Sequence, residues 1–296
     1  MKPLDAKSRI VVKNILLATD FSPTSEAALP HALTIAGHYG SKLYVAHVIC
    51  PELTDLLAPE LSPTILKQAQ EFAQQRMERL LSTGRQQGVP CQPLIGEGAI
   101  WDVLLDMIHQ NSIDLVVVGT HGRRGLRKLL LGSVAEEVFR LAPCPVLTVG
   151  PRTPEMRSAN VQLGQILYPL EFVPDSGDAA TYAVSLAEEY HAKLTLMKVF
   201  EDMVPFSEEK AQLPEPVSHW MEDHISTASD LRGRTSFEVG YGSAAEAILK
   251  LAAGRGVDLI VMGVRRLDPA MATHLLKPDT AYAVVRNAHC PVLTVR

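Results

Sequence analysis

The sequence has little of what several classes of protein require. It contains four cysteines and no C-x-x-C pair, so neither a disulfide framework nor a structural zinc site is expected. Its net charge is -5, which argues against a dedicated nucleic-acid-binding protein. No apolar run approaches the roughly 18 residues of a membrane span, and the first ten residues hold no apolar core of signal-peptide length. We expect a protein of the reducing cytoplasm that has no membrane span and binds no nucleic acid.

What is present is the composition of an ordinary globular protein. Hydrophobic residues make up 47% and charged residues 21% of the chain, so enough apolar surface is available to form a core and the chain is not disordered. A length of 296 residues accommodates two domains of common size, each with its own core.

The chain repeats itself, with the landmarks in the same order in both halves. The repeated pairs are DLVVVG (114–119) and DLIVMG (258–263), CPVLTV (144–149) and CPVLTV (290–295), ILLATDFSP (15–23) and ILYPLEFVP (166–174), and GEGAIWDVL (96–104) and GYGSAAEAI (240–248). This pattern predicts a duplicated domain. We expect one copy over 1–150, a polar, proline-bracketed linker over 151–160 and a second copy over 161–296.

Strand and helix patterns alternate within each half. In the first half, the apolar or alternating segments that predict strands are Ile15–Ala18, Leu43–Ile49, Gln92–Ile95, Leu115–Val118 and Val146–Val149. The segments with helical spacing of apolar residues are Thr24–Tyr39, Ser62–Gln87, Ala99–Asn111 and Ser133–Leu141. The alternation predicts an α/β fold with a mainly parallel sheet covered by helices. In such sheets, ligands bind beyond the carboxyl ends of the strands.

The stretch Val118–Val134, VGTHGRRGLRKLLLGSV, lies at such a position. It holds four glycines and four arginines or lysines, which is an unusual local charge for an acidic protein. The residues alone leave three interpretations open: a phosphate cradle, a solvated basic turn, or a nucleic-acid contact. Glycine allows a close approach to a phosphate, and a helix start near Gly132 would add unpaired N–H groups. Ser133 suits either a phosphate contact or a helix cap.

The spacing of this stretch resembles the nucleotide motif of the universal stress protein family. Gly119, two residues, Gly122, nine residues and then Gly132-Ser133 reproduce the pattern G-x2-G-x9-G-S/T. TDFS (19–22), HVI (47–49) and the closing PCPVLTV extend the resemblance over nearly the whole chain. It implies two Rossmann-like (adenine nucleotide α-hydrolase-like) domains, each with a five-stranded sheet in the order 3-2-1-4-5. It also implies binding of ATP, commonly with a divalent cation such as Mg²⁺.

The resemblance assigns a set of residues to the adenine nucleotide. They are Ala18, Thr19, Asp20, Val48, Val118, Gly119, Gly122, Arg124, Gly132, Ser133, Val134 and Ala135. Asp20 is an acceptor suited to a ribose hydroxyl or to the metal ion, although it also suits the cap region of the next helix. The basic residues of the loop either contact phosphate or form a solvated turn. No catalytic residue is assigned.

The second half departs from the nucleotide pattern. Glu171 stands in the place of Asp20, and Arg266 in the place of Gly122. Counting back from the cysteine places Pro278-Asp279 opposite Gly132-Ser133; proline lacks an N–H donor, and aspartate would repel a phosphate. We therefore expect ATP only in the first copy.

The function expected from these features is an ATP-binding stress protein with a regulatory or protective role. The alternatives are a slow ATPase, and a scaffold for proteins or an apolar ligand whose nucleotide site is vestigial. In the family, the last strands of two copies pair across a two-fold axis. The identical CPVLTV strands therefore predict an internal pseudo-dimer, with further homo-oligomers left open.

Overall fold

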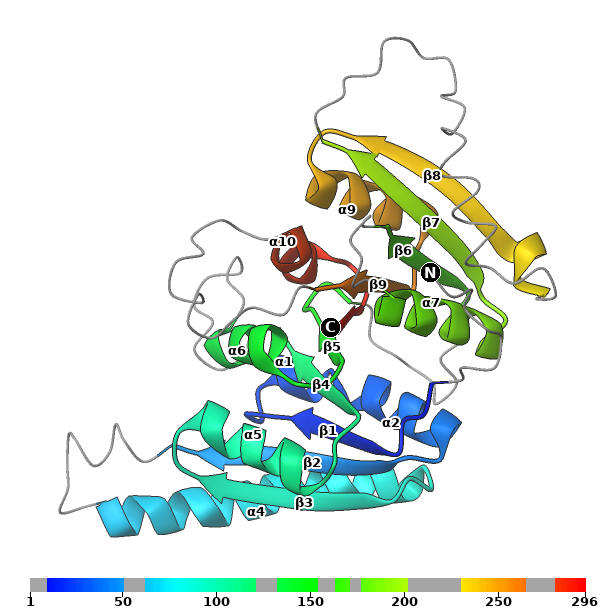
Figure 1. Ribbon diagram of the computed structural model, residues 1–296. Helices are drawn as coiled ribbons and strands as arrows, with labels where there is room; N and C mark the ends of the chain where they lie inside the picture. Colours follow the sequence, from blue (N-terminus) through cyan, green and yellow to red (C-terminus); the bar gives the residue numbers. More distant parts are fainter. Residues whose placement is uncertain are drawn as a thin grey trace. The chain divides into compact units, whose positions relative to one another are not determined.

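The computed structural model describes residues 10–50, 62–120, 132–153, 163–170, 177–201, 230–264 and 280–296. The chain divides into two compact units, one spanning Val11–Val161 and the other containing Gln162–Arg296 (Figure 1). Each unit is an α/β domain built on a parallel sheet. The predictions for Gly122, Arg124, Glu171, Arg266 and Pro278-Asp279 concern positions outside the described residues.

The first unit has the strand order predicted from the resemblance. Its strands are β1 (Asn14–Ala18), β2 (Lys42–Ile49), β3 (Cys91–Glu97), β4 (Leu115–Gly119) and β5 (Val146–Val149). Its described helices are α1 (Pro23–Glu26), α2 (Leu29–Tyr39), α4 (Ser62–Gln86), α5 (Ile100–Gln110) and α6 (Ser133–Leu141). The strands are parallel in the order β3-β2-β1-β4-β5. The order 3-2-1-4-5 is confirmed.

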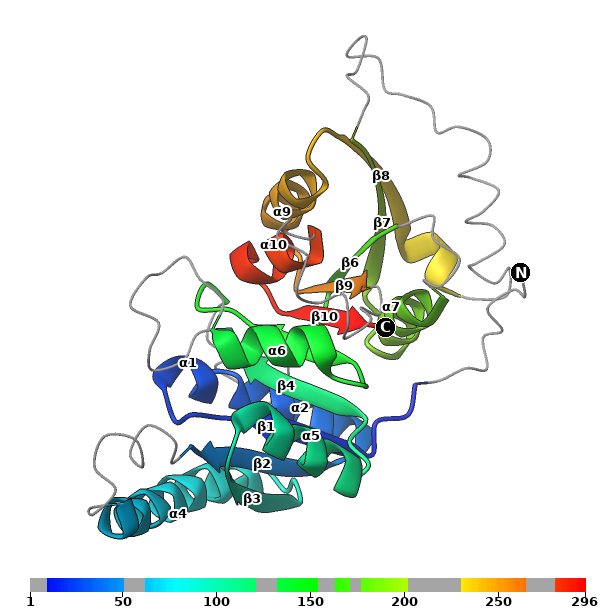
Figure 2. The same ribbon diagram turned by 60° about the vertical axis from the view of Figure 1, so that its left-hand side comes forward.

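Helices cover both faces of this sheet (Figure 2). A Cβ on Gly84 of α4 would collide with the Cys91 sulfur on one face of β3, and it would also meet Leu33 of α2. A Cβ on Gly96 would collide with Val103 of α5. Because side chains at odd and even positions of a strand point to opposite faces, α2 and α4 lie on one face and α5 lies on the other.

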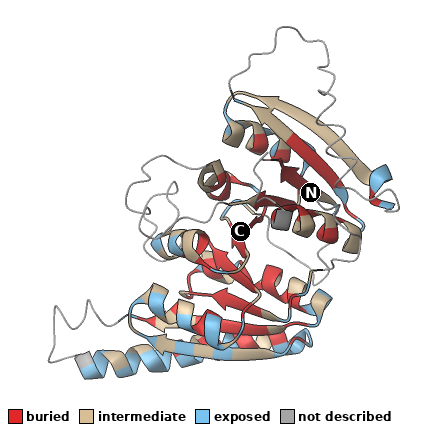
Figure 3. Cartoon of the chain, viewed as in Figure 1, coloured by how far each residue is buried: buried red, intermediate tan, exposed pale blue. Residues whose placement is uncertain are grey.

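The core of the first unit is centred on β1 and β4 (Figure 3). Ile15, Leu16 and Leu17 of β1 are completely buried, as are Val116 and Val117 of β4. A strand covered by helices on both faces reads as a continuous apolar run rather than an alternating one. This is why the short runs in the sequence predicted these strands well.

The helix predicted over Thr24–Tyr39 is interrupted, so that prediction was wrong in part. The structure has α1 and α2 in its place, with a turn between them. Pro30 stands in the first turn of α2, where it has no N–H to donate to the carbonyl four residues earlier, so one continuous helix loses a hydrogen bond there. The predicted end at Tyr39 is confirmed: Ser22 caps α1, and Gly40 follows α2 in the left-handed conformation with φ 64°.

The second unit repeats the topology of the first. Its strands are β6 (Gln165–Pro169), β7 (Lys193–Phe200), β8 (Thr235–Tyr241), β9 (Leu259–Gly263) and β10 (Val292–Val295). Its described helices are α7 (Gly177–Glu189), the 3-10 helix η1 (Asp230–Arg234), α9 (Ala244–Arg255) and α10 (Thr280–Asn287). The strands run in the order β8-β7-β6-β9-β10, which is again 3-2-1-4-5. In the described ranges of either unit, no helix combines the length and apolarity needed to traverse a bilayer.

The duplication extends to single hydrogen bonds. Asp114, just before β4, accepts the backbone N–H groups of Lys13 and Asn14 through Oδ2, at 2.8 and 2.9 Å. Asp258, just before β9, accepts those of Gly164 and Gln165, both at 2.9 Å. In each unit, one carboxylate thus ties the start of the fourth strand to the start of the first.

Candidate functional site

The carboxyl ends of β1 and β4 form the switch point of the first domain. The two strands are neighbours, with Ala18 opposite Val118. The chain leaves β1 toward β2 on one side and leaves β4 toward β5 on the other. Because the loops diverge there, an open α/β sheet binds its ligand just beyond Ala18 and Val118. We call this carboxyl-terminal side of the sheet the binding edge, or simply the edge.

A tight turn follows β1 and carries the predicted ligand Asp20. Thr19 is buried, and its hydroxyl accepts the Phe21 N–H at 3.0 Å. The Asp20 carboxylate accepts the Ser22 N–H through Oδ1 at 3.0 Å. Phe21, between them, has a φ of 59°, a left-handed conformation that is rare for a bulky residue. The turn therefore has two successive hydrogen bonds: one from Phe21 back to Thr19, which spans Asp20, and one from Ser22 back to Asp20, which spans Phe21.

Hydrogen bonds at the start of α1 also stabilise this turn. The Ser22 hydroxyl accepts the Ser25 N–H at 3.2 Å and so caps the helix. The Ser25 hydroxyl donates to the Ser22 carbonyl at 3.0 Å and lies 3.0 Å from the Thr19 hydroxyl. Asp20 itself does not cap α1. Ser22 does so, while Asp20 stabilises the turn that precedes it.

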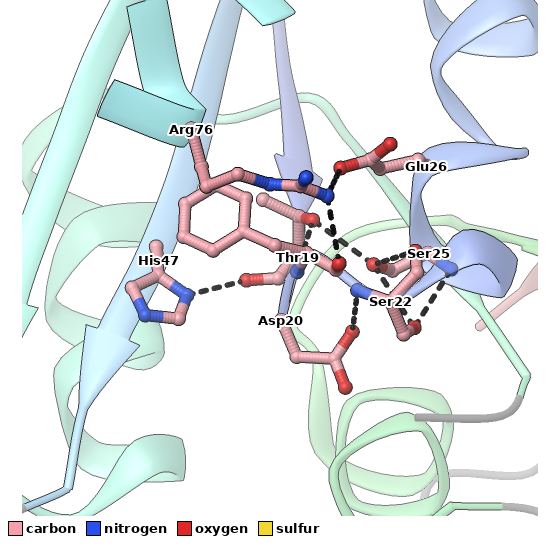
Figure 4. A network of polar contacts seen from close by, with 8 residues as sticks. Thr19, Asp20, Ser22, Ser25, Glu26, His47 and Arg76 are labelled. Carbon is pink, nitrogen blue, oxygen red and sulfur yellow. Dashed lines mark hydrogen bonds and ion pairs between the residues drawn. The ribbon is translucent and has the colours of Figure 1, made fainter. Parts of the chain in front are cut away.

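Two further side chains reach the turn from β2 and α4 (Figure 4). His47 donates from Nδ1 to the Thr19 carbonyl oxygen at 2.8 Å, and its ring packs on Phe21 with the centroids 4.3 Å apart. Arg76 donates from Nη2 to the Phe21 carbonyl at 3.1 Å and also pairs with Glu26. Sequence reasoning did not assign these residues to the site. His47 was visible in the HVI motif, whereas Arg76 gave no signal because a polar helix position reads as solvent-facing.

Gly119 is required by packing at the end of β4. A Cβ at this position would lie 2.7 Å from the Thr24 carbonyl oxygen and 2.9 Å from the Ser25 Cα. Real Cβ atoms essentially never come so close to backbone atoms. The glycine thus lets α1 sit directly against β4, which places the capped turn after β1 beside the end of β4.

The start of α6 is tied to the same edge. The Gly132 N–H donates to the Thr120 carbonyl oxygen at 2.8 Å, and Thr120 is the residue after β4. Gly132 is the N-cap of α6, and among the described residues the cap position supplies no side-chain hydrogen bond to this helix. Ser133 is therefore the first helical residue, and the interpretation of its hydroxyl as the cap is wrong. The helix itself offers no acceptor to the N–H groups of Ser133, Val134 and Ala135.

The remaining predicted residues that are described lie on the strands of this edge. Ala18 and Val118 are buried at the ends of β1 and β4. Val48 is half-buried near the end of β2, opposite Gly96 of β3. The edge thus brings together strand ends, the Asp20 turn and the start of α6. Within the described ranges, no group of three or more His, Cys, Asp or Glu side chains is arranged to hold a metal ion.

In its described residues, the second domain keeps a backbone contact of this edge but replaces two of the side chains. Leu170 donates its N–H to the Met197 carbonyl at 2.7 Å, as Thr19 does to Ala46 at 2.9 Å. Leucine has no hydroxyl for a turn like that of Thr19. The position of His47 is taken by Lys198, because Asn14 pairs with Lys42 and Gln165 with Lys193 in the same register.

Comparison with known proteins agrees with this architecture. The model of the Universal stress protein family matches residues 12–150 and again 163–296. A universal stress protein of Methanocaldococcus jannaschii is 32% identical over 138 residues, which are 46% of this chain and 81% of that protein. One of Mycolicibacterium smegmatis is 36% identical over 143 residues, which are 47% of this chain and 46% of that protein.

A solved structure shows the same fold over both halves. The crystal structure of a universal stress protein from Archaeoglobus fulgidus superposes with a TM-score of 0.72 and 19% sequence identity, covering 97% of each chain. The family model matches each half separately, and each half has the strand order expected of the family. The chain therefore belongs to the universal stress protein family, with two such domains in tandem.

Proposed function

We propose that the first domain binds ATP and that the protein acts through the bound nucleotide, in a regulatory or protective role, rather than as an efficient enzyme. The observation that carries the proposal is the hydrogen bond from Gly132 to Thr120. This bond sets the start of α6 at the strand edge from which the Asp20 turn also emerges.

The start of α6 supplies the groups that a triphosphate needs. The N–H groups of Ser133, Val134 and Ala135 have no acceptor within the helix, and the helix dipole adds partial positive charge. Glu136 is the acidic residue in the first turn of α6, and its carboxylate pairs with Arg140 Nε at 3.0 Å. This pairing neutralises a charge that would otherwise oppose phosphate. We assign Gly122 and Arg124 to the same phosphates on the motif alone.

The adenosine part is assigned to the ends of β1, β2 and β4. Ala18 and Val118 are apolar and largely buried, Val48 is partly accessible, and a carboxylate such as that of Asp20 can accept hydrogen bonds from ribose hydroxyl groups. Asp20 also fits a magnesium ion, because Mg²⁺ is commonly bound by one or two carboxylates together with substrate phosphates. The magnesium ion would then neutralise part of the phosphate charge. The second domain serves as a structural partner or binds a different ligand.

The proposal is tested by placing a charge at the cap of α6. Gly132 has φ −64° and ψ 144°, a conformation that any residue adopts, and aspartate is a favourable N-cap. Gly132→Asp should therefore keep α6 while adding a negative charge beside the phosphates. Titration calorimetry should show ATP affinity reduced by more than about tenfold, because like charges repel strongly at this range.

The matched control is Gly132→Asn, which has the same shape and cap preference but no charge. The Asn variant should bind ATP more tightly than the Asp variant, and both should keep the circular dichroism spectrum of the parent. Equal affinities in the two variants would contradict a phosphate at this position. Failure of the parent protein to bind ATP would contradict the function as a whole.

A further inference from the structure

Arg76 of α4 makes a pair of contacts that no other arginine described on this helix makes. Its Nη2 donates to the Phe21 carbonyl at 3.1 Å and pairs with the Glu26 carboxylate of α1, while its guanidinium carbon lies 6.0 Å from the centroid of the Phe21 ring. The side chains of Arg76 and Glu26 are 30% and 24% exposed. One side chain thus connects α4, the turn after β1 and the start of α1.

The residue that Arg76 holds is the strained one. A left-handed conformation is unfavourable for Phe and persists only where the surroundings impose it. The Phe21 N–H is held by Thr19 and its carbonyl by Arg76. Its ring is buried, 3% exposed, against His47. Two contacts to Phe21 come from α4: Arg76 holds the carbonyl, and the Phe72 ring packs edge-on against the Phe21 ring with the centroids 6.1 Å apart. Of these two, only the Arg76 contact fixes a backbone atom of Phe21.

The conformation of Phe21 determines where the Asp20 carboxylate points. The hydrogen bond from the Ser22 N–H to Asp20 Oδ1 spans Phe21. Rotation of the Phe21 backbone out of the left-handed region would separate these two groups. The carboxylate would then lose the hydrogen bond from Ser22 that helps to fix its orientation.

A surface ion pair with no role beyond modest stabilisation is the alternative explanation. The same helix provides the comparison. Arg85 pairs with Glu78 at 2.6 Å, both within α4, and the two side chains are 57% and 64% exposed. That pair connects no second element. Arg76 differs because it reaches a backbone carbonyl in the turn that carries a predicted ligand residue.

We propose that Arg76 is a positioning residue for the nucleotide site: by holding the Phe21 carbonyl and Glu26, it keeps the left-handed turn closed and fixes the Asp20 carboxylate for the ribose or the metal ion. This inference rests on the proposed ATP-binding function. It makes the position of α4 a determinant of nucleotide affinity, although no atom of α4 needs to touch the nucleotide.

The test compares Arg76→Met with Arg85→Met in the full-length protein. The first should weaken ATP binding about tenfold in calorimetry, and the second should leave it unchanged, since neighbouring coupled groups interact on this scale. Arg76→Lys should restore most of the affinity, because an ammonium group can also donate to the carbonyl and the carboxylate. In an Asp20→Asn background, Arg76→Met should have little further effect, since its action passes through Asp20.

Hydrogen exchange measured in the absence of nucleotide tests the positioning role of Arg76 separately from the proposed function. The Ser22 amide, which donates a hydrogen bond to the Asp20 carboxylate, should exchange at least about tenfold faster in Arg76→Met than in Arg85→Met. Unchanged exchange, or additive losses in the Asp20→Asn background, would overturn the positioning role even where the parent protein binds ATP. Absence of ATP binding by the parent would overturn the function, and with it the role of Arg76 at a nucleotide site, whatever the exchange rates are.

Discussion

Gly132 donates its backbone N–H to the carbonyl oxygen of Thr120 at 2.8 Å. The two residues are twelve positions apart in the sequence, yet this bond joins the end of β4 to the cap of α6. The start of α6 is therefore held at the edge of the sheet by the protein's own backbone. Binding of an anion there would not require the helix to be brought into place.

We predict one ATP bound per chain. The second half has Pro278-Asp279 opposite Gly132-Ser133, so it lacks a donor and adds a negative charge at that point. Calorimetry with the full-length protein should give a stoichiometry of one. Two equivalent sites would contradict the assignment of the second domain as a different or empty site.

Hydrolysis of ATP should be far slower than the roughly 1–100 s⁻¹ typical of kinases. The motif supplies backbone N–H groups and one serine hydroxyl, which bind phosphate but do not activate water. Steady-state release of phosphate measures the rate. A rate in the kinase range that is lost in His121→Ala, with ATP binding retained, would overturn the assignment as a binding protein.

Gly119→Ala should destabilise the first domain by about 1–3 kcal/mol, the usual cost of overpacking a well-packed site. The added methyl group would collide with the Thr24 carbonyl and the Ser25 Cα, which are backbone atoms and cannot rotate away. Urea denaturation measures the change. As the control, Gly37→Ala in α2 meets nothing within 4 Å and should stabilise the domain by about 0.5 kcal/mol; equal effects of the two would refute the packing argument.

His31 should make stability fall in mild acid. Burial lowers the pKa of His31 from 6.5 to about 4, so between these values the unfolded chain binds a proton that the folded chain does not. The free energy of unfolding is therefore highest above pH 6.5 and falls toward pH 4, by on the order of 3 kcal/mol from this group. Urea melts of His31→Leu across this range should show a shallower pH dependence than those of the exposed control His38→Gln. Identical slopes would count against the assignment.

Residues 1–150 expressed alone should dimerise. Each copy ends in the same strand sequence, VLTV, in β5 and in β10, and a final strand offers backbone groups to a second strand. We expect the two copies to pair antiparallel about a two-fold axis within the full chain. Sedimentation equilibrium measures the association, and a folded fragment that stays monomeric at high concentration would contradict internal pairing.

Most of the fold follows from the sequence because buried strands and capped helices leave local signals. The limits of Val146–Val149 and Ser133–Leu141 were predicted to the residue, since Pro145 and Gly132 mark their starts. The break before Pro30 was missed because the apolar spacing continues across it. The proline itself is compatible with a new helix that starts there, since proline is common in the first turn of a helix. The turn around Phe21 was not foreseen either. Phenylalanine carries no local preference for positive φ, and the contact from Arg76 that supports it comes from 55 residues away.

The ties made by Asp114 and Asp258 lie at the amino ends of their sheets, whereas the proposed nucleotide groups lie at the carboxyl ends. Closing the sheet and recognising a ligand therefore depend mainly on different residues at opposite ends of the same strands, with Gly119 serving the packing of α1 at the binding end. The second domain has Leu170 in place of Thr19 and Lys198 in place of His47 at its carboxyl end and still closes its sheet. The two domains thus share one fold but differ in the residues at the carboxyl ends of their strands. The second domain is a natural variant in which a different ligand site can form without changes to the core.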